Sequence, residues 1–282
     1  MIKFVYIIIS CAIVVSFTGC IQGVVKLVLK EDGSGTIQEK FMVKKFIVNL
    51  HKSYSELERS KSDSITEKAV NFYNDDEIIE HSKSFGDDVS YESHNFIIND
   101  KWEGYSAVYS FNDVSKVKLG LIPSKIGEIE VSEDLSGILK AYYYFKFIRG
   151  GTLELNVDCL NNEIVKFQND QNEIVEKEEK NDQEEENALR LLRGMLKDAI
   201  IKLSIEVEGD IVNTNANYVI GSEVTLFLLD VNEMVKNEEC SDEYFNKFLL
   251  RESNSIYNLI ELFNKCPTMK LEVEKMLTIN FK

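Results

Sequence analysis

Closely spaced carboxylates are the first residues in this chain that could carry out chemistry. Two groups, Asp75-Asp76-Glu77 and Glu208-Gly209-Asp210, have the residue types that general acid and base catalysis uses. Carboxylates are so frequent here, with 48 aspartates and glutamates in 282 residues, that such groups arise by chance. The sequence has no nucleophile-elbow, P-loop, dinucleotide-binding or HExxH motif. We therefore expect a protein that is not an enzyme and has neither catalytic residues nor a cofactor.

Cysteines and histidines are the other candidates for chemistry. Beyond residue 20, their spacing fits no zinc pattern, so we expect no metal site. The cysteines could form at most one intramolecular disulfide, with one thiol left over, and the sequence does not say which pair forms it. The residues concerned are Cys159, Cys240, Cys266, His51, His81 and His94.

Cys20 follows an apolar run that predicts export. The run from Phe4 to Phe17 has about 14 residues, which is short of the roughly 20 that a spanning helix needs. Lys3 precedes the run, and Thr18 and Gly19 lie just before Cys20, which is the layout of a signal peptide over residues 1–19. The alternative is an ordinary cleaved signal in which Cys20 is merely nearby.

The tetrapeptide Phe17-Thr18-Gly19-Cys20 resembles the lipobox of bacterial lipoproteins. This resemblance implies that Cys20 is acylated, for example with palmitate, and becomes the first residue of the mature chain. Two or three acyl chains would hold the protein stably at a bilayer surface. We therefore expect Cys20 to be a lipid anchor, in the outer membrane or on the outer face of the cytoplasmic membrane.

The composition limits the choice of partners. A formal net charge of -16 makes binding to nucleic acid unfavourable. Such a surface binds cations or basic partners more readily. The expected partners are thus the membrane, through the acyl chains, and a further protein or lipid.

Alternating patterns predict two β-hairpins. Strand residues over 25–29 and 36–43 flank the turn sequence DGSG, and strands over 141–148 and 152–157 flank Arg149-Gly150-Gly151. The second hairpin contains three consecutive tyrosines. We interpret them as part of a half-buried strand with aromatic cross-strand pairs, and a ligand-binding role is the alternative.

The region between the hairpins is less regular. Residues 50–84 are expected to be helical or irregular, with a helix starting after Asp75-Asp76-Glu77. Strands are predicted at 89–98 and 105–111, joined by a turn at Trp102-Glu103-Gly104. The lone Trp102 suits a core or hairpin position better than stacking on a sugar or lipid.

The second half begins with an acidic stretch, residues 169–187, which we expect to be a flexible loop. An apolar stripe predicts a helix over 188–200 that packs on a sheet. A longer stripe predicts helices after Ser241, and residues 269–281 are expected to form a short helix or strand.

Strands at 203–208 and 224–230 surround an Asn-rich bend and the turn Gly221-Ser222. Together with the opening hairpin and its DGSG turn, this order resembles the LppM-like lipoprotein domain of bacterial envelopes, over about residues 23–237. The resemblance implies an α+β domain with an antiparallel sheet, contact with lipid or glycolipid, and no catalytic residues.

These observations predict the α+β class, with an antiparallel sheet built from hairpins, packed helices and a helical C-terminal segment. The expected parts are the signal peptide (1–19), a β-rich part (20–168), the acidic loop (169–187), a helix with the closing hairpin (188–237) and a C-terminal helical segment (238–282). The expected function is that of a non-enzymatic interaction or structural module anchored to the envelope. The alternative is a lipid- or glycolipid-binding protein with an apolar cavity between sheet and helices.

Overall fold

The structure is a computed structural model of the 282-residue chain. It describes residues 21–49, 53, 73–120, 125–126, 129–130, 142–148, 150–157, 198–236, 240, 266, 268–272, 274 and 276–282.

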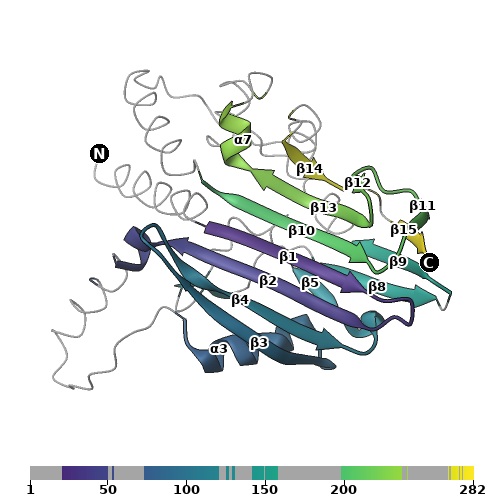
Figure 1. Cartoon of the computed structure of the whole chain (residues 1–282), viewed down its shortest axis with the longest axis horizontal. Helices are drawn as coiled ribbons and strands as arrows, with labels where there is room; N and C mark the ends of the chain where they lie inside the picture. Colours follow the sequence, from purple (N-terminus) through teal and green to yellow (C-terminus); the bar gives the residue numbers. More distant parts are fainter. Residues whose placement is uncertain are drawn as a thin grey trace, which may run out of the picture.

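Eight strands form the larger of the sheets: β1 (Ile21–Leu29), β2 (Gly35–Lys44), β3 (Val89–Ile98), β4 (Trp102–Phe111), β10 (Ile200–Val207), β12 (Val219–Ile220), β13 (Glu223–Asp230) and β14 (Met269–Leu271). Their order is β12-β13-β10-β1-β2-β4-β3, and β14 also pairs with β13. β1 and β10 run parallel, whereas the other neighbours are antiparallel (Figure 1).

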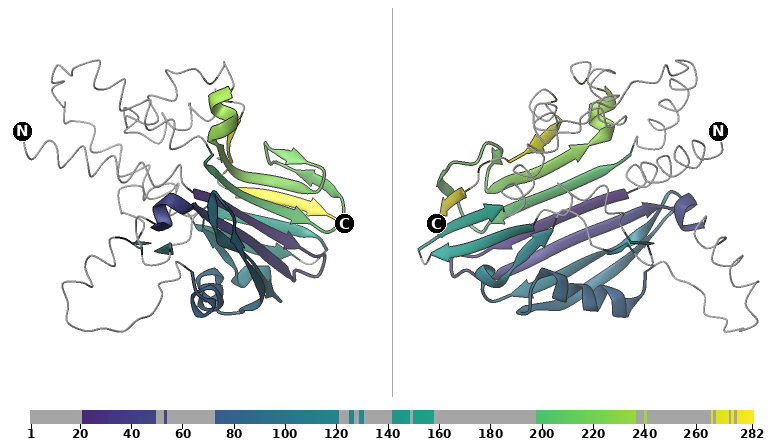
Figure 2. Two further views of the ribbon diagram at one scale, coloured as in Figure 1. Left: turned by 60° about the vertical axis from the view of Figure 1, so that its left-hand side comes forward. Right: turned by 180° about the vertical axis from the view of Figure 1, so that it is seen from behind.

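A smaller sheet has the strand order β11-β15-β9-β8-β5. Its strands are β5 (Lys118–Gly120), β8 (Tyr142–Ile148), β9 (Thr152–Val157), β11 (Ile211–Thr214) and β15 (Met276–Phe281). Two short strands, β6 (Lys125–Ile126) and β7 (Ile129–Glu130), pair only with each other. Strands β5, β8 and β9 lie behind β1 and β2 in Figure 1 and in front of them in the right-hand view of Figure 2.

The hydrophobic core is formed by the inner faces of the two sheets. In β1, residues alternate strictly between buried and partly exposed, so that Val25, Leu27 and Leu29 point inward. Leu153 and Leu155 of β9 are likewise buried and belong to the same apolar cluster. Burial of apolar surface between two sheets is the main stabilising contribution in such an arrangement.

The described helical residues are 45–49, Ser53, α3 (Asp75–His81), the 3₁₀ helices η1 (Ser82–Phe85) and η2 (Val114–Lys116), and α7 (Val231–Lys236). α3 begins as the acidic cluster predicts: the Asn74 side chain accepts a hydrogen bond from the Glu77 N–H, and three acidic residues occupy the first turn. No helix in the described part of the chain is long and apolar enough to cross a bilayer.

The predicted α+β class is wrong, because the described part of the chain is predominantly β. The prediction relied on helices packed against a single sheet, whereas a second sheet covers the larger one. The helical C-terminal segment that was expected is also wrong, whereas the strand that was the alternative at 269–281 is confirmed. Residues 269–271 and 276–281 form β14 and β15, with alternating burial, and β15 lies between β11 and β9. The helix predicted over 188–200 does not extend to its predicted end, because Ile200 is the first residue of β10. Residues 188–197 of that helix, the helices predicted at 241–263 and the acidic loop at 169–187 lie outside the described residues.

Both predicted hairpins are confirmed. β1 pairs with β2, and β8 pairs with β9, each in the antiparallel register that the turns predict. In the first turn, the Asp32 carboxylate accepts hydrogen bonds from the N–H and hydroxyl of Ser34, and Gly33 has a φ of 88° that favours glycine. These hydrogen bonds also lower the pKa of Asp32.

The turn between β3 and β4 was predicted in the wrong place. It lies at residues 99–101, because the Asn99 side chain accepts hydrogen bonds from the N–H groups of Lys101 and Trp102. Trp102 is therefore the first residue of β4 and is buried. Strand β11 was missed, since the expected bend past Asn213 covers residues that pair with β15.

The three tyrosines of β8 alternate as a half-buried strand predicts. Tyr143 is buried, whereas Tyr142 and Tyr144 are exposed. In the described register none of the three is directly opposite an aromatic residue, unlike the predicted aromatic cross-strand pairs: Tyr142 is opposite Gly120, Tyr143 is opposite Leu119 and Val157, and Tyr144 is opposite Lys118 and Asn156.

Candidate functional site

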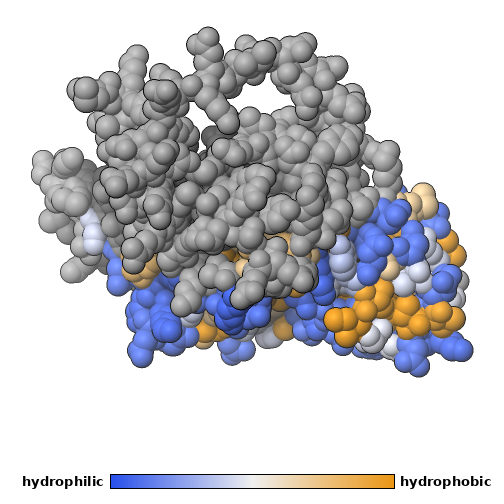
Figure 3. All heavy atoms as spheres, turned by 90° about the horizontal axis from the view of Figure 1, so that it is seen from above, coloured by the Kyte–Doolittle hydropathy of each residue, from blue (hydrophilic) through white to orange (hydrophobic). Residues whose placement is uncertain are grey.

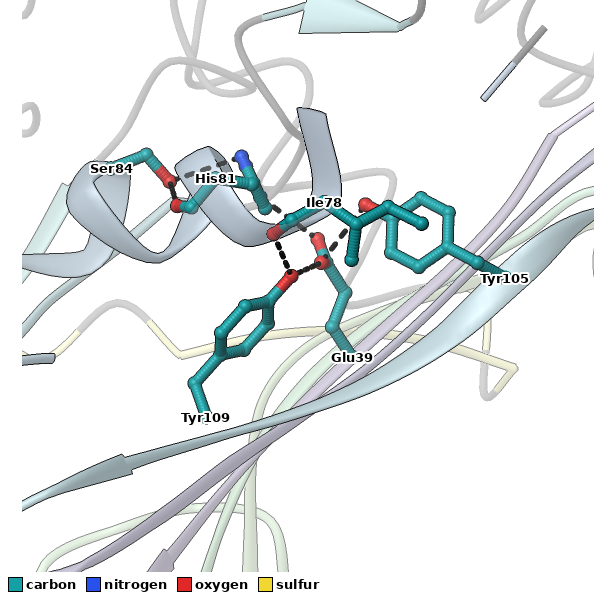
Figure 4. A network of polar contacts seen from close by, with 6 residues as sticks. All are labelled: Glu39, Ile78, His81, Ser84, Tyr105 and Tyr109. Carbon is teal, nitrogen blue, oxygen red and sulfur yellow. Dashed lines mark hydrogen bonds and ion pairs between the residues drawn. The ribbon is translucent and has the colours of Figure 1, made fainter. Parts of the chain in front are cut away.

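A buried polar cluster lies between the larger sheet and α3 (Figure 4). Its centre is the carboxylate of Glu39 in β2, which is only 3% exposed. Glu39 is opposite Ala107 of β4, so that Tyr105 and Tyr109, two residues to either side of Ala107, flank it on the same face. The register of two strands therefore places a carboxylate between two phenols.

Both tyrosines donate hydrogen bonds toward this centre. The Tyr105 hydroxyl donates to Oε2 of Glu39 at 3.0 Å. The Tyr109 hydroxyl lies 3.4 Å from the same oxygen and 3.2 Å from the carbonyl oxygen of Ile78 in α3, and it shares its one hydrogen between these acceptors. Burial, and then the charge of Glu39, raise the pKa of both hydroxyls far above the ordinary value, so they stay neutral donors.

His81, the last residue of α3, completes the cluster. Its Nε2 lies 3.2 Å from Oε1 of Glu39, and its Nδ1 lies 3.2 Å from the hydroxyl oxygen of Ser84 in η1. The Ser84 hydroxyl already donates to the carbonyl oxygen of His81 at 2.7 Å, so it faces Nδ1 as an acceptor. Both ring nitrogens are therefore best placed as donors, which requires the imidazolium form.

The electrostatics agree with this assignment. Burial lowers the pKa of His81, but the charge of Glu39 and the hydrogen bond to it raise that pKa, and the net result lies above the ordinary value. His81 and Glu39 thus form a buried ion pair whose remaining hydrogen-bonding positions are occupied by Ser84, Tyr105 and Tyr109. The ring of His81 also stacks edge-on against Phe85, with centroids 4.9 Å apart.

The residue types Ser84, His81 and Glu39 are those of a hydrolytic triad, but their arrangement suits a structural role. An imidazolium that donates from both nitrogens has no lone pair with which to activate a serine. The hydrogen of Ser84 is committed to the main chain of the same short helical segment. The cluster instead attaches α3 and η1 to the larger sheet through charge-assisted hydrogen bonds.

Sequence analysis missed this cluster. One signal was available: in the alternation of Ile37, Glu39 and Phe41, the carboxylate occupies an inward-facing position, and a charge at such a position needs a partner. The identity of that partner was hidden, because His81 lies 42 residues further along the chain.

The other candidates from the sequence are placed as follows. The anchor candidate Cys20 lies outside the described residues, and β1 begins at the next residue, Ile21. Asp75, Asp76 and Glu77 form the exposed first turn of α3, and Glu208 and Asp210 lie at an exposed bend after β10. Among the described residues, no three His, Cys, Asp or Glu side chains gather as metal ligands do.

The structure identifies the disulfide that the sequence left open. Cys240 is bonded to Cys266, and both are buried. The remaining cysteine of the predicted mature chain beyond Cys20, Cys159, lies outside the described residues.

Comparisons with known proteins add little to this geometry. A scan against models of protein families finds no match, and a search of the curated proteins also finds none. A similar solved structure is the NMR structure of the folded domain of the Mycobacterium tuberculosis LppM protein, with 10% sequence identity over 76% of this chain and 84% of that chain. Its TM-score is 0.29, and no conclusion about function is drawn from this likeness.

Proposed function

We propose that this protein is a bacterial lipoprotein, acylated at Cys20, that acts as a non-enzymatic interaction or structural module at a membrane surface of the cell envelope. The membrane is either the outer membrane or the outer face of the cytoplasmic membrane. A protein or lipid that contacts the folded part is its second partner.

The observation that carries this proposal is the position of Cys20 relative to the fold. The residues Phe17-Thr18-Gly19-Cys20 have the lipobox layout, and the first strand of the larger sheet starts directly at Ile21. Cleavage before Cys20 would thus remove only residues that precede β1. An acylated Cys20 would be attached to the central part of the sheet.

The Cys240–Cys266 disulfide supports export. Disulfides persist in oxidising compartments, such as the bacterial periplasm and cell surface, and are rare in the cytosol. The non-enzymatic role is supported by the buried cluster, in which His81 is engaged at both nitrogens by Glu39 and Ser84.

Metabolic labelling tests the proposal. Cells that produce the native chain are fed a palmitate analogue, and the mature N-terminus is identified by mass spectrometry. We expect label on the native protein and none on Cys20→Ala, whereas Cys159→Ala, the matched control for acylation of another thiol, keeps the label. An unlabelled native protein, or label that persists in Cys20→Ala, would contradict the lipid anchor.

A further inference from the structure

The pairing of β1 fixes one end of the larger sheet next to Cys20. β1 has neighbours on both sides from its first residues, because Ile21 pairs with Val43 of β2 and Gln22 pairs with Ile200 of β10. Consecutive Cα atoms are about 3.8 Å apart, so an acyl anchor on residue 20 has no linker between it and the sheet. An anchor at Cys20 therefore brings this end of the sheet to the bilayer surface.

Four further segments meet at this end, which is on the left in Figure 1. They are the end of β2 with the helical turn 45–49, the turn between β3 and β4, the start of β10, and the end of β13, where Asp230 pairs with Ile200. The Lys45 N–H donates to the carbonyl oxygen of Lys101 at 2.8 Å, and the Lys44 ammonium lies 3.3 Å from the Asp198 carboxylate. We call this end the anchor-side rim and define it by these described residues: Lys44, Lys45, Phe46, Ile98, Asp100, Lys101, Glu103, Asp198 and Asp230.

The anchor-side rim exposes large apolar side chains. Phe46 is 46% exposed and Ile98 is 65% exposed, although Ile47 and Val48 of the same helical turn are buried. Exposed aromatic and branched aliphatic side chains next to lysines are typical of surfaces that lie in a membrane interface.

The charge of the rim differs from that of the whole chain. Among its described residues are three lysines (Lys44, Lys45 and Lys101) and four carboxylates (Asp100, Glu103, Asp198 and Asp230), whereas the chain has a formal charge of -16. A surface that is close to balanced is repelled less by anionic lipid headgroups than the chain as a whole. The anchor-side rim thus combines proximity to the anchor, apolar exposure and a small net charge.

We propose that the anchor-side rim rests on the lipid headgroups, with Phe46 and Ile98 inserted into the membrane interface. This inference deepens the proposed function and rests on it. The anchored protein then has a fixed orientation: β1 leads away from the bilayer, and its nine residues place the turn after Leu29 up to about 30 Å from the surface.

The test supplies the anchor chemically, so that it does not depend on acylation in the cell. The mature chain is produced from Cys20 onward, and its N-terminal cysteine is ligated to a single-chain lipid thioester; internal cysteines lack the free α-amine that this ligation needs. One acyl chain gives only weak, reversible membrane binding, so the contribution of the rim is measurable. Partitioning into vesicles of phosphatidylethanolamine and phosphatidylglycerol is measured by flotation.

We expect the double variant Phe46→Asp, Ile98→Asp to lose about tenfold in its partition coefficient. The matched control is Ile220→Asp, which places a charge on a 73% exposed apolar residue of β12. β12 lies at the end of the sheet far from the start of β1, where apolar residues also reach the surface (Figures 1 and 3). This control should partition like the native protein.

The single tryptophan provides a second readout. Trp102 is opposite Lys44 in the sheet, and the Lys44 ammonium lies 5.9 Å from the centroid of the Trp102 ring. The fluorescence of Trp102 therefore reports on the surroundings of the anchor-side rim. A lipid with a spin-labelled headgroup should quench its fluorescence in the native anchored protein and less in the double variant. If the native protein, the double variant and the control partition equally and the fluorescence is not quenched, the proposed contact between the anchor-side rim and the membrane is wrong. The proposed acylation of Cys20 is not affected by that result. Absence of palmitate label in cells would overturn the anchor instead, and the two failures are thus distinguishable.

Discussion

At the scale of single residues, the buried ion pair of Glu39 and His81 determines how firmly α3 is held. Replacing one member leaves the other as an uncompensated buried charge, which is more costly than the pair itself is favourable. Tyr105 would also lose a hydrogen-bond acceptor. The residues of the cluster therefore depend on one another, and replacing one of them should lower the stability by more than the loss of a single hydrogen bond.

We expect Glu39→Leu to lower the free energy of unfolding by about 3 to 5 kcal/mol, measured by urea denaturation. The matched control is Gln38→Leu, at the neighbouring exposed position of β2, for which we expect a change within about 0.5 kcal/mol. Equal effects of the two substitutions would show that the ion pair has no special role.

The pH dependence of stability follows from the raised pKa of His81. A group that binds its proton more tightly in the folded state stabilises the fold fully below its unfolded pKa of about 6.5, and this stabilisation is lost as the pH rises through the folded-state pKa. The native protein should therefore become less stable as the pH is raised from about 6 through the folded-state pKa of His81. The free energy of unfolding is measured by urea denaturation at several pH values. In His81→Gln, the decrease of this free energy with rising pH that His81 causes should be absent. An unchanged slope in the variant would exclude His81 as its source.

At the scale of elements, the Cys240–Cys266 disulfide joins the chain after α7 to the residues before β14. The two cysteines are 26 residues apart, and closing a loop of this size stabilises the folded state by about 3.5 kcal/mol in the chain-entropy model. We expect Cys240→Ser to lose about this much, measured by urea denaturation without reductant. Reduction should lower the free energy of unfolding of the native protein and leave that of Cys240→Ser unchanged. A further decrease in the variant on reduction would contradict the pairing of Cys240 with Cys266.

Elements were predictable where their partners are adjacent in sequence. The hairpins β1–β2 and β8–β9 have an alternating pattern and a glycine-containing turn within a single short stretch. β11 and β15 are short strands whose pairing connects Ile211 with Phe281, and no local pattern contains that information. The same reason explains the wrong fold class, because the second sheet includes pairs of segments that are distant in sequence.

At the scale of the whole molecule, the candidate site was less predictable than the fold. Glu39 could be recognised as a charge at an inward position, but its partners come from β4, α3 and η1. The anchor at Cys20 was predicted from the opposite kind of signal, a short local motif that needs no partner, and it stays a prediction. Sequence therefore gives local motifs more readily than it indicates which distant residues meet.

The parallel pairing of β1 with β10 also constrains how the chain can fold while it is being delivered from its N-terminus, by the ribosome or by the proposed export. The strands β1 to β4 can form an antiparallel sheet from the first 111 residues, but the second edge of β1 stays open until Ile200–Val207 has emerged. Pairing at such sequence separation is slow, and an open strand edge pairs readily with other chains. The nascent chain should thus depend on chaperones until most of the polypeptide has been delivered.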